Sequence, residues 1–256
     1  MPTVIRALLV FLACLWGAAA TAAPASFHDT MAQRTLACTA CHGKEGRAGP
    51  DGYYPRIAGK PAGYLYNQLL NFREGRRHYG LMAGLLDTLS DDYLYEIAQY
   101  FSRLDLPYPP PQPPAAPPEV LERGRAIAQQ GDAERRVPAC ARCHGKALTG
   151  VVPQFPGLLG LSRDYLVAQL GAWRTGERRA FAPDCMAEVA RRLSPDDLFA
   201  VTAYLAAEPL PRNAHPVTPK PPAPPRKKGR KAAPPPPPEE PLPLRCGFAP
   251  LPEAAR

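Results

Sequence analysis

Two cysteines and a histidine form the group of residues best suited to chemistry in this chain, and the group occurs twice. The copies are Cys38-Thr-Ala-Cys41-His42 and Cys140-Ala-Arg-Cys143-His144, which start 102 residues apart. Thiols three positions apart can add to the two vinyl groups of a haem, and the histidine that follows can bind the iron as proximal ligand. The repetition predicts two covalently attached haem c groups.

A haem iron that has one histidine ligand keeps a second axial position. Methionine sulfur there suits electron transfer, whereas an open position suits chemistry on small ligands. Met82 lies 40 residues after His42, and Met186 lies 42 residues after His144. The matching positions predict that both methionines are axial ligands. His78, four residues before Met82, is an alternative ligand in the first half only.

The N-terminus has the pattern of an export signal. Arg6 precedes an apolar run from Ala7 to Ala18, and Thr21-Ala22-Ala23 fits a cleavage site. We interpret residues 1–23 as a signal peptide; an uncleaved anchor is the alternative, although the apolar run is short for a membrane span. A periplasmic location follows, and it suits haem c, which bacteria attach outside the cytoplasm.

Two cysteines remain when the haem motifs and Cys14 of the leader are set aside. They are Cys185 and Cys246. Two leftover cysteines in an oxidising compartment are a plausible pair. We expect a Cys185–Cys246 disulfide that ties the C-terminal region back near the second haem, with two free thiols as the alternative.

The formal net charge of +8 comes from the C-terminal region. Residues 24–106 hold nine basic and nine acidic residues, and residues 119–208 hold twelve and eleven, whereas residues 209–256 hold nine and three. The near-neutral body argues against a nucleic-acid-binding protein. The basic tail could contact an acidic partner or an anionic membrane surface, with a solvated spacer as the alternative.

Residues 24–106 and 119–208 follow one pattern, which indicates an internal duplication. Each has a motif, a loop, a helix with an apolar face and a final helix that begins at a serine cap. We therefore predict two tandem helical domains of the same kind. The helices expected before the motifs run from Met31 to Cys38 and from Glu119 to Gln130, and the capping serines are Ser90 and Ser194.

Proline marks the segments outside these domains. Eight of the twelve residues in 107–118 are proline, which predicts an extended linker. Such a spacer reaches up to roughly 37 Å at about 3.1 Å per residue. Residues 209–256 contain seventeen prolines and the basic block Arg226 to Lys231, so we expect a tail that is mostly disordered.

With the repeats aligned, the chain resembles the dihaem cytochrome c4 family of bacterial class I c-type cytochromes. The resemblance rests on three paired segments: Cys38 to Gly43 with Cys140 to Gly145, Pro55 to Leu69 with Pro156 to Leu170, and Met82 to Ser90 with Met186 to Ser194. It implies an all-α fold around each haem, His/Met ligation and periplasmic electron transfer. It also implies that the carbonyls of Pro55 and Pro156 accept a hydrogen bond from the proximal imidazoles. The proline-rich linker departs from the family and leaves close packing of the two domains open.

The function expected from these features is one-electron transfer in a respiratory chain, without bond chemistry at the protein. The partners would be a membrane-bound or periplasmic donor and a terminal oxidase or reductase. A dihaem peroxidase-like enzyme or a haem-based sensor is the alternative, but either needs a displaceable axial ligand, and the paired methionines argue against one. A zinc site is the weakest alternative because neither motif has a second pair of cysteines to complete it.

Overall fold

The computed structural model describes residues 28–219 and 244–252. The chain divides into two compact units, Met1–Arg34 and Thr35–Arg256, and both cysteine-histidine motifs lie in the second unit. The first unit contributes only helix α2 (Met31–Arg34) to the described part. The leader, residues 1–23, lies outside the described residues. None of the helices described is long and apolar enough to cross a membrane.

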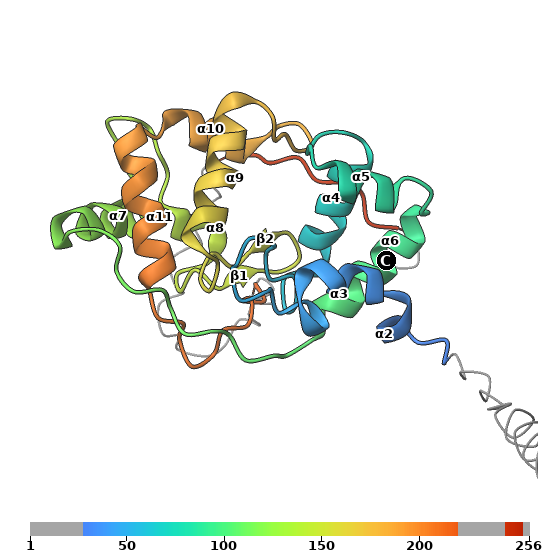
Figure 1. Cartoon of the computed structure of the whole chain (residues 1–256). Coiled ribbons are helices and arrows are strands. Elements are labelled where there is room, and N and C mark those ends of the chain that lie inside the picture. The colour runs from blue at the N-terminus through green and yellow to red at the C-terminus, as the bar shows by residue number, and fades with distance from the viewer. Residues whose placement is uncertain (1–27, 220–243, 253–256) are drawn as a thin grey trace, which may run out of the picture. The chain divides into compact units, whose positions relative to one another are not determined.

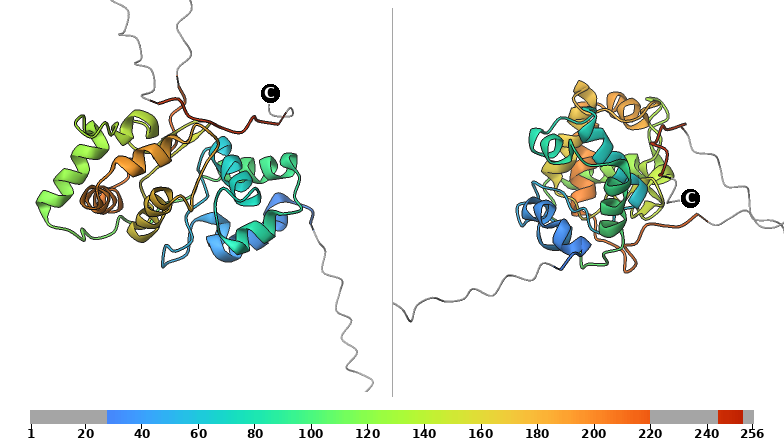
Figure 2. Two further views of the ribbon diagram at one scale, coloured as in Figure 1. Left: turned by 90° about the horizontal axis from the view of Figure 1, so that it is seen from above. Right: turned by 90° about the vertical axis from the view of Figure 1, so that its right-hand side faces the viewer.

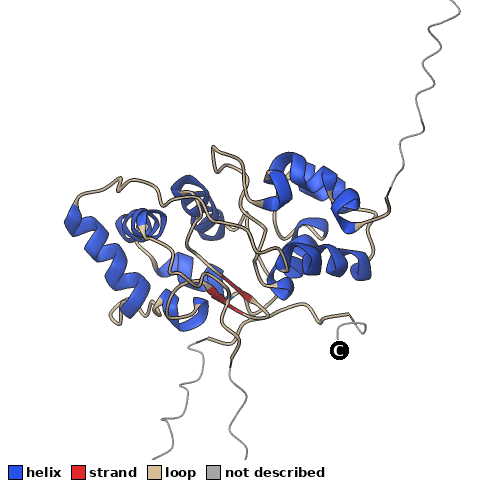
Figure 3. Ribbon diagram, turned by 90° about the horizontal axis from the view of Figure 1, so that it is seen from below, coloured by secondary structure: helices blue, strands red, loops and turns tan. Residues whose placement is uncertain are grey.

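Helices make up almost all of the regular structure (Figures 1 and 3), which confirms the all-α prediction. The first half contains α3 (Leu36–His42), a 3-10 turn η1 (Lys44–Gly46), α4 (Ala62–Arg73), α5 (Gly80–Leu86) and α6 (Asp91–Ser102). The second half contains α7 (Pro118–Gln130), α8 (Cys140–His144), α9 (Arg163–Thr175), α10 (Cys185–Arg192) and α11 (Pro195–Ala207).

A two-stranded sheet lies in the second half, where the sequence pattern does not indicate one. Strands β1 (Gly150–Val151) and β2 (Phe155–Pro156) pair antiparallel, with Val151 opposite Phe155. A β-branched residue opposite an aromatic one is a favourable cross-strand pair. The sheet is too short to change the fold class, but it places Pro156 beside the second motif.

Serine caps begin the helices expected from the sequence. Ser90 accepts a hydrogen bond from Tyr93 N at the start of α6, and Ser194 accepts one from Asp197 N at the start of α11. The helix expected from Met31 to Cys38 is instead interrupted at Thr35. The Thr35 carbonyl accepts from Cys38 N at 3.0 Å, so a new helix, α3, begins there and carries the whole motif.

Apolar side chains from the helices form the core of each half. In the second half, Ile127 on α7, Leu166 on α9 and Val201 on α11 are all buried. Helices α7 and α11 approach closely at Gly124, where a Cβ would lie 2.1 Å from Ala200 O. In the first half, α4 packs against α6, and Leu70, Leu94 and Phe101 are buried between them and their neighbours.

The proline-rich linker lies on the body of the protein rather than forming a free spacer. The Arg56 guanidinium donates to Leu106 O and Pro107 O at 2.6 and 2.9 Å and lies 3.9 Å from the centre of the Tyr108 ring. Further along, Gln112 N donates to Ala206 O at 2.9 Å. The prediction of a spacer is wrong in this respect. In addition to its prolines, the linker contains a tyrosine and a glutamine that contact the body of the protein.

The two halves pack against each other, which the sequence left open (Figure 2). The backbone at Arg77 forms an antiparallel bridge with Arg178, and Arg179 N donates to Arg76 O at 2.7 Å. A second contact joins Tyr64 N to Pro153 O at 3.0 Å. The contact between Arg77 and Arg178 joins equivalent positions of the two repeats.

Part of the C-terminal region is also packed. Val217 N donates to Gly150 O at 2.8 Å, and Val217 O accepts from Val152 N at 3.0 Å, so residues 209–219 extend to strand β1. Residues 244–252 form a second described segment. The basic block and most of the prolines expected to be disordered fall in residues 220–243, outside the described residues.

Candidate haem sites

Short helices present the two cysteine-histidine motifs. In α3, Cys38 and Cys41 are three residues apart and therefore share a face of the helix. Each motif helix ends at its histidine, and the next residue is a glycine with positive φ: 74° at Gly43 and 83° at Gly145. A Cβ at Gly43 would lie 2.3 Å from Ala48 O, so this turn requires glycine.

The two motif histidines have the same hydrogen bond. His42 Nδ1 donates to Pro55 O at 2.8 Å, and His144 Nδ1 donates to Pro156 O at 2.7 Å. A carbonyl can only accept, so Nδ1 carries the proton and Nε2 keeps the lone pair that an iron atom needs. Burial lowers the pKa of both imidazoles, which keeps them neutral. The hydrogen bonds expected of Pro55 and Pro156 are therefore present.

The motif cysteines are not arranged as a zinc site. Burial raises the pKa of Cys38 and Cys143, and it raises that of Cys140 to about 11. A structural zinc site needs four ligands. Within the described residues, no group of three or more His, Cys, Asp or Glu side chains could hold a metal ion. Two thiols beside one neutral imidazole fit covalent haem attachment instead.

The two candidate methionine ligands lie on equivalent short helices. Met82 is on α5 and Met186 is on α10, and both side chains are half-buried. Asp184 caps α10 by accepting a hydrogen bond from Ala187 N at 3.0 Å. The alternative ligand His78 is exposed in the turn that precedes α5.

Two buried arginines lie between the halves and provide a test of whether a haem fits. Arg77 donates to Gln68 at 3.0 Å and to Gln169 at 2.8 Å, and Arg178 donates to the same two side chains at 2.9 and 2.7 Å. Neither arginine forms an ion pair with a carboxylate in the described part of the chain. Burial lowers the pKa of Arg178 to about 10.

A buried indole nitrogen completes that test. Trp173 Nε1 is buried and has no hydrogen-bond partner among the described residues. Buried cations without anions and a buried donor without an acceptor are both costly. The propionate groups of a haem are anionic acceptors, so these residues fit that cofactor.

Lys60 makes the surroundings of the two motifs unequal. This first-half side chain is 3% exposed, and its Nζ donates to Gly157 O at 2.8 Å, next to Pro156. Burial lowers the Lys60 pKa to about 7. The aligned residue of the second half is Leu161, which cannot make this contact. The sequence analysis missed Lys60; its only signal was a lysine in one repeat where the other has leucine.

Cys185 and Cys246 form the disulfide expected from the cysteine count. The two sulfur atoms are 2.08 Å apart, and the bond joins α10 to the C-terminal segment. Cys185 directly precedes Met186, so this covalent link lies next to a candidate ligand.

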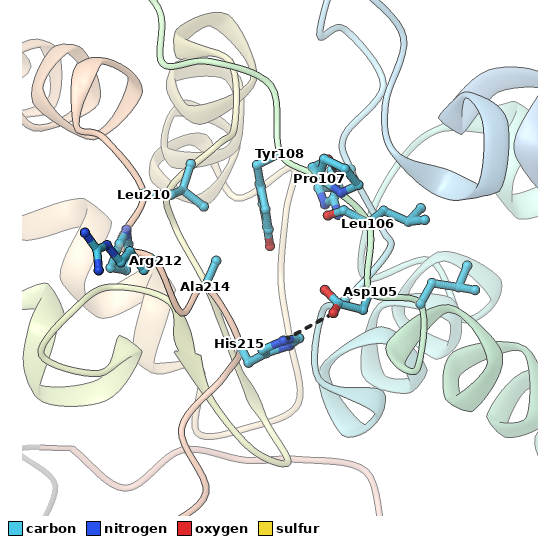
Figure 4. Close-up of a pocket in the computed structure, with 12 residues that line it drawn as sticks. Asp105, Leu106, Pro107, Tyr108, Leu210, Arg212, Ala214 and His215 are labelled. Atoms are coloured by element: carbon cyan, nitrogen blue, oxygen red, sulfur yellow. Dashed lines mark hydrogen bonds and ion pairs between the residues drawn. The ribbon is translucent and has the colours of Figure 1, made fainter.

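A cavity of about 490 Å³ lies where the linker meets the segment that follows α11 (Figure 4). Tyr108 and Leu210 line it, and His215 Nε2 lies 3.6 Å from Asp105 Oδ2 there. None of the motif cysteines, histidines or candidate methionine ligands lines it, so this cavity is not either haem site.

Known proteins resemble this chain over most of its length, although no family model matches it. A "Thiosulfate dehydrogenase electron acceptor" of Thiomonas intermedia is 39% identical over 195 residues, covering 76% of this chain and 88% of the relative. A "Cytochrome c4" of Pseudomonas aeruginosa is 32% identical over 174 residues, covering 67% of this chain and 84% of the relative.

The solved structures that resemble this chain have names related to those of these relatives. Reduced recombinant cytochrome c4 from Pseudomonas stutzeri has a TM-score of 0.61 and 30% identity, covering 69% of this chain and 96% of that one. The thiosulfate dehydrogenase TsdBA from Marichromatium purpuratum has a TM-score of 0.60 and 35% identity; the match covers 68% of this chain but spans only 36% of the solved chain.

The relatives are named as a cytochrome c4 and as an electron acceptor, and nothing in the comparisons favours a peroxidase or a sensor. The same cofactors, two covalently attached haem c groups, fit the motifs and the buried groups described above. This chain belongs to the cytochrome c4 family and carries electrons on two haem c groups.

Proposed function

We propose that this protein is a periplasmic one-electron carrier of a respiratory chain and catalyses no bond chemistry itself. Its donor would be a dehydrogenase, and its acceptor a terminal oxidase or reductase. One relative is named as the electron acceptor of thiosulfate dehydrogenase, so that enzyme is the proposed donor class. The observation that carries the proposal is the pair of buried, neutral imidazoles, one per half, each with Nε2 free for iron.

The proposed ligand sets are equivalent in the two halves. Cys38 and Cys41 would hold the first haem and Cys140 and Cys143 the second, and the iron ligands would be His42 with Met82 and His144 with Met186. A haem held in this way would supply a one-electron iron couple. The protein orients each imidazole through a proline carbonyl, and a methionine on each iron would exclude a substrate from it.

The proposed docking surface for a redox partner lies on the first half, beside Met82. Leu81 and Leu85 on α5 are 69% and 42% exposed, and Tyr53 is 63% exposed. Tyr53 packs edge-on against Tyr54, whose hydroxyl lies 3.0 Å from that of Tyr79 at the start of α5. The body of the protein is near neutral in charge, so an apolar contact with weak salt dependence is expected.

The leader and the tail have separate proposed roles. Residues 1–23 direct export and are removed, with an uncleaved anchor as the alternative. The basic block Arg226 to Lys231 adds a weak contact to an acidic partner or an anionic membrane surface. Both segments lie outside the described residues.

The test is electron delivery to the purified dihaem protein. Thiosulfate and a thiosulfate dehydrogenase are mixed with the oxidised protein under anaerobic conditions, and haem reduction is followed by absorption. We expect both haems to be reduced, with two electrons taken up per chain. Failure of this donor while another dehydrogenase reduces both haems would overturn the proposed donor. Rapid peroxide turnover, or carbon monoxide binding to one reduced haem, would overturn the carrier function in favour of an enzyme or a sensor.

A further inference from the structure

The C-terminal segment 244–252, which we call the strap, contacts both sides of the second haem site and also the first half. Its sequence lies outside the segments that resemble the family. It is held covalently by the Cys185–Cys246 disulfide. The following residue, Gly247, donates its N–H to Pro183 O at 2.9 Å, and a Cβ there would lie 2.1 Å from Ala182 O. The strap therefore lies tightly against the turn that leads into α10.

The first contact of the strap is on the methionine side of the site. Cys185 is the first residue of α10, and Met186 is the second. A methionine on a chain segment that cannot move away can leave an iron only by rotation of its own side chain. Here the segment is fixed by a capping aspartate, Asp184, and by a covalent bond to the strap one residue from the sulfur ligand.

The second contact is on the histidine side. Phe248 packs edge-on against Phe155, with ring centres 5.6 Å apart and planes at 90°. Phe155 in turn packs edge-on against His144, with centres 6.3 Å apart. Such aromatic pairs are worth about 0.5–1.5 kcal/mol beyond the area that they bury. The strap thus supports the ring that borders the proximal imidazole.

A third contact anchors the strap to the first half. Ala249 is 4% exposed, and its N–H donates to Asn67 Oδ1 on α4 at 2.8 Å. Asn67 Nδ2 donates to Gln154 Oε1, which belongs to the loop between β1 and β2, at 2.7 Å. One buried asparagine therefore joins the first half, the strap and the loop that precedes Phe155.

The covalent link has no equivalent at the first haem site in the described residues. Aligning Met82 with Met186 places Leu81 at the position of Cys185, and Leu81 is 69% exposed. Aligning Pro55 with Pro156 places Tyr54 at the position of Phe155. Tyr54 likewise packs edge-on against its motif histidine, His42, and is contacted by Tyr53 and Tyr79 of its own half. The support that is found in the second half alone, among the described residues, is therefore the disulfide next to the candidate methionine.

We propose that the strap is a positioning element for the second haem, holding Met186 and the Phe155 ring so that the second methionine dissociates more slowly than the first. The proposal rests on the ligand set proposed above. A crosslink and a packed ring reduce the conformations available once the methionine has left, so rebinding is favoured over escape. An outside ligand or a partner therefore reaches the iron from the methionine side less readily in the second half than in the first.

The test measures methionine loss at each haem of the whole protein. Cyanide is added to the oxidised form, and its binding rate at each haem is followed by absorption. Upfield methionine methyl signals of the reduced form, recorded by NMR, identify the two sites. In Cys246→Ser, we expect cyanide binding at the second haem to be about tenfold faster, which corresponds to roughly 1.4 kcal/mol. The rate at the first haem, the internal control, should not change.

Phe248→Ala is the second variant, since it keeps the disulfide and removes the ring. It should give a smaller increase in the cyanide-binding rate, again only at the second haem. If Cys246→Ser does not fold, this variant alone tests the proposal. Unchanged rates in the variant that folds would overturn the proposal, and so would equal acceleration at both haems. The proposed ligand set is tested separately, and it is wrong if Met186→Ala leaves both methionine methyl signals in place.

Discussion

The two halves of this protein have the same candidate ligands at matching positions but differ in what surrounds them. Each half has a histidine whose Nδ1 donates to a proline carbonyl and a methionine on a short helix. The second half in addition receives Lys60 from the first half and a disulfide from the C-terminal segment. The two repeats thus share their candidate ligands, whereas contacts that reach the second half from outside it make the two sites unequal.

The largest expected effect is the loss of one haem while the other stays bound. In Cys140→Ala/Cys143→Ala, the second haem loses its covalent attachment, whereas Cys38 and Cys41 still hold the first. We expect one haem per chain instead of two, measured by mass spectrometry and by the haem-to-protein ratio. The matched variant Cys38→Ala/Cys41→Ala should lose the other haem. Two covalently bound haems in either variant would contradict the assignment of the motifs.

A second prediction concerns the helix crossing in the second half. In Gly124→Ala, the added methyl group would lie 2.1 Å from Ala200 O, so α7 and α11 must separate. Overpacking of this kind costs typically 1–3 kcal/mol of unfolding free energy. Gly171→Ala on α9 is the matched control, because nothing lies within 4 Å of its Cβ. Urea unfolding should show Gly124→Ala destabilised and the control unchanged or slightly stabilised; equal effects would refute the close crossing.

The third prediction concerns the buried side chain of Lys60, which the first half contributes to the second, and the dependence of stability on pH that it causes. Burial lowers the pKa of Lys60 from 10.5 to about 7, so the folded protein loses this proton near pH 7 while the unfolded chain keeps it up to about pH 10.5. The unfolded state binds more protons in this window, so stability rises with pH there, by at most about 1.4 kcal/mol per unit. Below pH 7 both states are protonated and the contribution is constant.

Lys60→Met removes that contribution. Unfolding free energies of both proteins at pH 7.5 and 9.5 should show a larger gain with pH for the natural protein than for the variant. Comparing the two proteins cancels the other groups that titrate in this range. Parallel pH dependences would show that the lysine is not buried in its neutral form.

The smallest expected effect is on partner docking. In Leu81→Asp, a charge replaces an exposed apolar side chain beside Met82, and stability should stay within about 0.5 kcal/mol. Reduction by the donor enzyme should show a KM raised several-fold. The matched variant Phe199→Asp changes another exposed apolar residue, on α11 of the second half, and should leave KM unchanged. Equal KM values for the two variants would contradict the proposed docking surface on the first half.

Local patterns predicted the ligands and caps but not the contacts between distant segments. The motifs, the serines at positions 90 and 194, the paired methionines and the disulfide follow from spacing, composition and counting. The attachment of the linker through Tyr108, the contact of Lys60 with Gly157 and the position of Phe248 do not. These depend on how the two repeats pack, and a period in the sequence carries no information about that packing.

The far-red absorption of the oxidised protein tests the central claim most directly, because sulfur bound to ferric haem gives a weak band there. The natural protein should show this band, Met82→Ala and Met186→Ala should each lose about half of its intensity, and the double variant should lose it all. A band that survives in the double variant, or that is absent from the natural protein, would contradict His/Met ligation in both halves.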